Sequence, residues 1–238
     1  MSLLESAPKR LGSFAGAGSK AYRAHRVYDK LAFLTGITVV TGAVFASMVD
    51  RSANLGAFII PAFVIAIGCS LAGSFRPHLA KTVAPIYALA EGAVLGVISK
   101  FYANLGGGIV PTAIVATGAL FVGCLIVFRS GLVKVTPRFT AMIGIGLMAL
   151  FALYVASWIG LSVPGIGDIG PKGMIFGVIG LALGVGSLFI DFERIRQFED
   201  GGSMSDSAEW FLSFQLLLSL VMIYINVLRI LASSSRRN

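Results

Sequence analysis

The sequence has few of the residues from which catalytic and metal sites are built. It contains two histidines and two cysteines in 238 residues, and Cys69 and Cys124 both lie within apolar runs. A disulfide framework and a zinc site are therefore disfavoured, because either would need more of these residues. Neither the zinc-protease pattern His-Glu-x-x-His nor a Walker-type phosphate loop occurs, so the sequence predicts no enzyme.

Charge is also scarce. Only 13% of the residues are charged, with 19 basic against 11 acidic side chains, whereas 56% are hydrophobic. This composition excludes an ordinary soluble domain and indicates a polytopic membrane protein. The net charge of +8 could suggest nucleic-acid binding, but the basic residues cluster between the apolar runs. We therefore relate them to membrane orientation and expect no nucleic-acid partner.

Seven apolar runs follow one another, each long enough to cross about 30 Å of hydrocarbon. We place the spans at about 31–49, 55–75, 83–102, 109–128, 138–160, 172–191 and 208–231. The connections are short, so the expected fold is all-α, a seven-transmembrane-helix bundle. The expected divisions are a basic N-terminal tail (1–29), a membrane domain (30–232) and a short basic tail (233–238).

Local signals and charge define helix starts and orientation. Thr136 before Pro137 predicts a capped helix start, and Asp206 with Glu209 resembles a capping box for the last span. Lysine and arginine gather in the N-terminal tail and in the second, fourth and sixth connections, which places the N-terminus in the cytoplasm. Seven spans would leave the C-terminus outside. The basic pair 236–237 opposes this, and a re-entrant last span would return the C-terminus to the cytoplasm.

One carboxylate stands at the end of a row of small residues. The row consists of Gly173, Gly177, Gly180, Gly184, Ser187 and Asp191. Its spacing of three or four residues places all of them on one helix face, where the glycines predict close helix packing. Asp191 ends this face near the cytoplasmic side and is a candidate gate or ion-site residue. The alternative is a boundary residue in water, paired with Arg194 or Lys81.

Two further polar features lie inside the spans. Glu91 is near the middle of the third span, where it must face the interior as a pathway residue or as a hydrogen-bonded structural one. The seventh span carries a polar face made of Gln215, Ser219, Met222, Asn226 and Arg229. Such a face is costly against lipid, so this helix should be central, whether it lines a pathway or hydrogen-bonds to its neighbours.

Several segments together resemble the Bax inhibitor family, the transmembrane Bax inhibitor motif proteins. They are LAEGAVLGVISKFY (89–102), FRSGLVKVTPRFT (128–140), LFIDFERI (188–195) and YINVLRIL (224–231). The first two resemble a bacterial branch. The resemblance implies a seven-helix bundle with the last helix central, in a bacterial inner membrane.

The resemblance also implies an activity and a site. Family members are described as pH-sensitive calcium leak channels that modulate cell death or stress. They use one aspartate on each of the last two helices, and a basic residue at the end of the second helix locks the closed state. Asp191 corresponds to the first aspartate and Arg76 to the basic residue, but Ser219 stands at the second aspartate. Asp191 alone is a weak candidate calcium ligand, because calcium prefers several oxygen ligands.

Two functions follow from these observations. The first is a pH-modulated leak pathway for calcium or protons, in which protonation of Asp191 releases Arg76. Glu91, Ser219 and Asn226 would belong to that pathway. The second is a non-transporting membrane regulator that binds a membrane-anchored ATP-dependent protease or a stress or cell-death partner through the N-terminal tail. Apart from calcium, neither function implies a cofactor.

Overall fold

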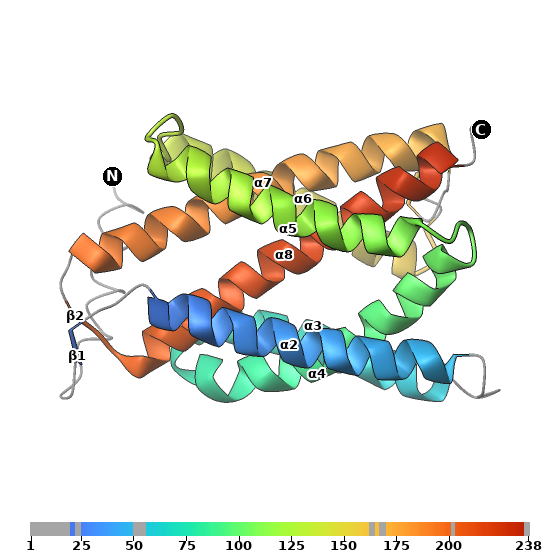
Figure 1. Cartoon of the computed structure of the whole chain (residues 1–238), viewed down its shortest axis with the longest axis horizontal. Coiled ribbons are helices and arrows are strands. Elements are labelled where there is room, and N and C mark those ends of the chain that lie inside the picture. The colour runs from blue at the N-terminus through green and yellow to red at the C-terminus, as the bar shows by residue number, and fades with distance from the viewer. Residues whose placement is uncertain are drawn as a thin grey trace. The chain divides into compact units, whose positions relative to one another are not determined.

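The computed structural model of the chain describes residues 20–21, 25–49, 56–161, 165–166, 170–200 and 203–235. Their α-helices are α2 (His25–Met48), α3 (Gly56–Phe75), α4 (Ala80–Ala103), α5 (Ile109–Arg129), α6 (Pro137–Trp158), α7 (Pro171–Asp200) and α8 (Asp206–Ser235) (Figure 1). A short 3-10 helix, η1 (Pro77–Leu79), precedes α4. Strands β1 (Lys20–Ala21) and β2 (Ser203–Met204) pair antiparallel.

Each predicted span corresponds to one of these helices, so the expected all-α fold is confirmed. Among the described residues, six helices are long and apolar enough to cross a membrane, and the described apolar part of α3, Ile59–Phe75, is shorter. The chain is therefore a multi-pass integral membrane protein.

Several helices extend beyond the apolar runs that predicted them. Helix α2 begins at His25 rather than near residue 31, and α7 continues to Asp200 rather than ending near 191. A hydrophobic run marks only the part of a helix that faces hydrocarbon. The backbone hydrogen bonds continue through polar residues at either end.

The two predicted helix starts have different outcomes. Thr136 caps α6 as predicted, since its hydroxyl accepts a hydrogen bond from the Phe139 amide at 3.2 Å. The prediction of a capping box at the start of α8 is wrong. The Glu209 amide donates to the Ser205 carbonyl at 3.2 Å, and the carboxylates of Asp206 and Glu209 bind Lys30 of α2 instead. Pairing with a cation stabilises these carboxylates more than a neutral backbone donor would.

The chain divides into two compact units. The first comprises Met1–Lys100 with Arg194–Leu218, and the second comprises Phe101–Glu193 with Ser219–Asn238. Most of α7 belongs to the second unit, and α8 contributes its first half to the first unit and its second half to the second.

In the first unit, α8 packs against three helices. The ring of the buried Phe214 meets the Tyr87 ring of α4 edge to face at 5.2 Å. The same ring faces Gly73 of α3, where an added Cβ would lie 2.5 Å from it. The Ser213 hydroxyl donates to the Val27 carbonyl of α2 at 2.8 Å. Aromatic burial and satisfied polar groups thus hold α8 among its neighbours in this unit.

In the second unit, α8 packs against α6 and α7. The Arg229 guanidinium lies 5.6 Å from the Tyr154 ring centroid on α6, and Ser219 hydrogen-bonds to Asp191 of α7. Because α8 contacts several helices in each unit, the expected central last helix is confirmed.

Candidate functional site

Asp191 is buried and linked directly to α8. Only 3% of the surface of Asp191 is exposed, and the Ser219 hydroxyl donates to its Oδ2 atom at 2.6 Å. The Ser187 and Ser219 hydroxyl oxygens lie 2.9 Å apart. Since the Ser219 proton points to Asp191, Ser187 donates to Ser219. We call these three residues the Asp191 link. It joins α7 to α8 through a hydrogen bond that an ionised carboxylate strengthens.

The glycines of α7 that precede this link along the helix lie against α8. A Cβ added at Gly177 would lie 2.9 Å from Ile230 Cγ1, and one at Gly184 would lie 3.0 Å from Ile223 Cγ1. A Cβ at Gly180 would collide with the Asn226 side chain. The two helices can therefore approach closely only because side chains are missing here. Gly173, the first glycine of the row, is buried.

The polar face predicted for the last span is buried at most of its positions. Ser219, Asn226 and Arg229 are all at least nine-tenths buried. The Asn226 amide nitrogen donates to the Met222 carbonyl at 2.8 Å. The second half of α8 thus buries its hydrogen-bonding groups along its contact with α7. The same groups would be costly if they faced lipid.

A family model described as Bax inhibitor 1 like matches residues 13–236. The chain belongs to this family. Comparison with curated proteins gives no match. Membership confirms the resemblance to the Bax inhibitor family, and it agrees with the helical, multi-pass architecture.

This Bax inhibitor 1-like chain pairs a carboxylate with a hydroxyl where the resemblance implies two aspartates. Ser219 stands where the second aspartate is expected, and its hydroxyl donates one hydrogen bond of 2.6 Å to Asp191. A serine–carboxylate pair can bind one proton but has a single negative charge, so it attracts a divalent ion less strongly than two carboxylates would.

The other predicted site residues of the Bax inhibitor 1-like chain belong to the first unit. Glu91 is 9% exposed, and the Tyr87 hydroxyl one turn earlier donates to it. This bond satisfies a polar group of the buried side chain, and the role of Glu91 stays a prediction. Arg76 is exposed and precedes η1. Asp191 lies in the second unit, so its pairing with Arg76 stays a prediction.

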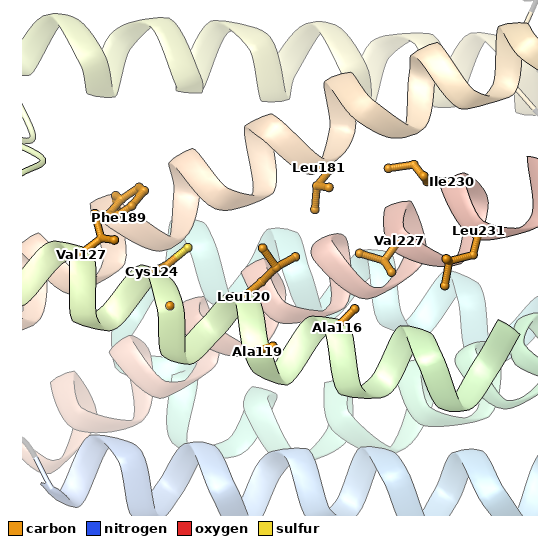
Figure 2. Close-up of a pocket in the computed structure, with 11 residues that line it drawn as sticks. Ala116, Ala119, Leu120, Cys124, Val127, Leu181, Phe189, Val227, Ile230 and Leu231 are labelled. Carbon is orange, nitrogen blue, oxygen red and sulfur yellow. The ribbon is translucent and has the colours of Figure 1, made fainter. Parts of the chain in front are cut away.

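No candidate metal cluster accompanies Asp191 in the part of the chain that the structure describes. Those residues contain no group of three or more His, Cys, Asp or Glu side chains that could hold a metal ion. The second unit has a pocket of about 580 Å³. Figure 2 shows its lining side chains between α5, α7 and α8, among them Leu120, Cys124, Leu181 and Val227. All of its lining residues are apolar, so the pocket is unsuited to a hydrated ion.

Sequence reasoning missed an ionic cluster in the first unit. Lys30 Nζ lies 2.8 Å from Glu209 Oε2 and 2.6 Å from Asp206 Oδ1. Arg26 approaches Glu209 at 3.8 Å, and Lys81 approaches Asp206 at 3.1 Å. We call this set the Lys30 cluster. In the sequence, the only indication of this cluster is the pair of acidic residues before the last apolar run. The same pair is also typical of a capping box, so the sequence does not distinguish the two.

Proposed function

We propose that this Bax inhibitor-like protein is a pH-modulated leak pathway for cations, gated by Asp191. The observation that carries the proposal is the burial of Asp191 between α7 and α8, with Ser219 bound to its carboxylate. An ionisable group inside a membrane helix is a functional-site candidate by default, because such groups mark ion pathways and proton relays. The same proposal places the protein in a bacterial inner membrane with its N-terminus in the cytoplasm. It also assigns the protein no catalytic activity.

The gate would work through the strength of the Asp191 link. While Asp191 is ionised, the Ser219 hydrogen bond is charge-assisted and holds α7 against α8. Protonation leaves a neutral bond of roughly half that strength. The glycine face of α7 presents few side chains that would resist a small shift along α8. Of calcium and protons, a single carboxylate with two hydroxyls suits the proton, because calcium takes about six to eight oxygen ligands.

Asp191→Asn is expected to remove the pH dependence of the flux. In proteoliposomes containing the wild-type chain, cation flux should be greater at about pH 6 than at about pH 8. The difference between a charge-assisted and a neutral hydrogen bond is about 1 kcal/mol, which changes the open population by roughly fivefold. Asparagine keeps the side-chain shape but cannot ionise. Dyes sensitive to protons and to calcium, enclosed in the vesicles, measure both fluxes.

Asp200→Asn is the matched control for this experiment, because Asp200 is an exposed carboxylate at the end of the same helix. It should keep the wild-type pH profile. Equal flux in wild type and Asp191→Asn at both pH values would overturn the leak proposal. That result would favour the non-transporting regulator, which binds a protease or stress partner.

Ser219→Asp is expected to create a calcium response. The new carboxylate would lie beside Asp191, and at about pH 8 two negative charges would attract calcium. At about pH 6 the pair would share a proton, so the gain should disappear. The same vesicles should show severalfold higher calcium flux than wild type at the higher pH only. Ser219→Asn supplies a neutral control of similar size. If the two variants conduct calcium equally, the carboxylate pair is not what selects the ion.

A further inference from the structure

Three polar atoms on one face of α8 are buried without a hydrogen-bond partner among the described residues. They are Asn226 Oδ1, Arg229 Nη1 and Ser233 Oγ. Their spacing of three and four residues places them in successive turns of the helix. Buried polar atoms are rarely left unpaired in folded proteins, and a group of them indicates a missing ligand or water.

The charge of Arg229 makes this face unusual. A guanidinium keeps its proton at all physiological pH values, so burial cannot neutralise it. Arg229 is 8% exposed, and its guanidinium lies over the Tyr154 ring. A cation–π contact offsets only part of the cost of removing a guanidinium from water.

No described carboxylate balances this charge. The ion pairs of the Lys30 cluster lie in the first unit, and Arg229 forms no ion pair with a described side chain. Asp191 is on the same helix pair, but it binds Ser219, ten residues before Arg229 on α8. At 1.5 Å per residue this is about 15 Å along the helix. The positive charge of Arg229 therefore calls for a negative partner of another kind.

The glycines of α7 bring its backbone close to this charge. A Cβ at Gly177 would lie 3.5 Å from Arg229 Cδ, and Gly180 faces the Asn226 side chain. On the α7 side, the guanidinium is thus flanked by small residues that carry no charge of their own.

We propose that Arg229 binds a small monovalent anion of the chloride class, held by Nη1 and by the Ser233 hydroxyl. Both groups can donate a hydrogen bond, whereas Asn226 Oδ1 can only accept one and is left for water. A single negative charge neutralises the guanidinium without leaving a second charge to bury. Occupancy would hold α6, α7 and α8 together, and it does not depend on the protein conducting ions.

The direct test is equilibrium binding of radioactive chloride to the full chain purified in detergent. We expect about one chloride per chain for the wild type, and the same for Arg129→Gln, an exposed arginine at the end of α5. Arg229→Gln should lose the binding, and Arg229→Lys should weaken it several-fold. A second readout on the wild type is its thermal unfolding midpoint, which should rise when chloride replaces gluconate at constant ionic strength.

Two results would overturn the proposal. If the wild type binds no chloride and unfolds at the same temperature in both salts, water fills the site. Asp168 lies outside the described residues and is the remaining acidic candidate on the connection before α7. Chloride binding that appears only in Asp168→Asn would assign the counter-charge to the chain itself.

Discussion

Replacing Gly96 by alanine is expected to destabilise the protein by about 1–3 kcal/mol, the usual cost of overpacking. An added Cβ would collide with the Gly42 carbonyl oxygen of α2 and lie 2.9 Å from the Gly42 Cα. One turn away, a Cβ at Gly92 would lie 2.6 Å from the Thr38 carbonyl oxygen. These are backbone atoms, which cannot rotate aside as a side chain could. Helices α2 and α4 would have to separate.

Thermal unfolding of the purified full chain measures this effect. Gly36→Ala is the matched control, because Gly36 is on α2 and an added Cβ there meets nothing within 4 Å. Alanine favours a helix over glycine by roughly 0.5–1 kcal/mol, so this control should be neutral or stabilising. The two substitutions are chemically identical, yet only Gly96→Ala should destabilise the protein. Similar unfolding temperatures would show that α2 and α4 do not pack through these glycines.

Lys30→Met is expected to cost about 3 kcal/mol, near the lower end of the range for breaking a buried ion pair. The Glu209 side chain is 4% exposed and that of Lys30 is 17% exposed. Without Lys30, the carboxylate would keep only Arg26, at 3.8 Å. Methionine preserves most of the side-chain volume beside Trp210, whose ring centroid lies 5.1 Å from the Lys30 amine. The loss therefore measures charge more than packing.

Two comparisons sharpen the Lys30 experiment. Lys81→Met breaks a pair whose side chains are 65% and 55% exposed, and surface pairs of this kind contribute less than about 1 kcal/mol. Combining Lys30→Met with Glu209→Gln removes the uncompensated charge and should recover part of the lost stability. If the double variant is no more stable than Lys30→Met alone, burial of the Glu209 charge is not the cause of the loss.

Helix identity was predictable because it depends on local sequence. Seven apolar runs separated by short polar segments leave few alternatives in a membrane. The cap at Thr136 is likewise a contact between neighbours in the chain. By contrast, Glu209 had two possible partners. Its pairing with Lys30, far away in the sequence, won because an ammonium satisfies a buried carboxylate better than a backbone amide does.

The glycine patterns show how far a sequence predicts helix packing. The row on α7 predicts a close-packed helix face that ends in Asp191. Gly92 and Gly96 form a small-xxx-small motif in α4 that was equally visible in the sequence. What the sequence did not show is the opposite surface, where Thr38 and Gly42 of α2 meet it. A helix face can be read from periodicity, but its partner depends on how distant segments pack.

The sequence by itself determined the membrane class, the seven helices and the single face shared by Asp191 and the glycines above it. These properties follow from hydrophobicity and from the 3.6-residue period, which act within one segment. Only the tertiary structure decided that Asp191 is buried against Ser219, that Glu209 binds Lys30, and that Arg229 has no described acidic partner. Burial and charge pairing depend on contacts between separate helices, and the spacing of residues within one segment does not specify those contacts.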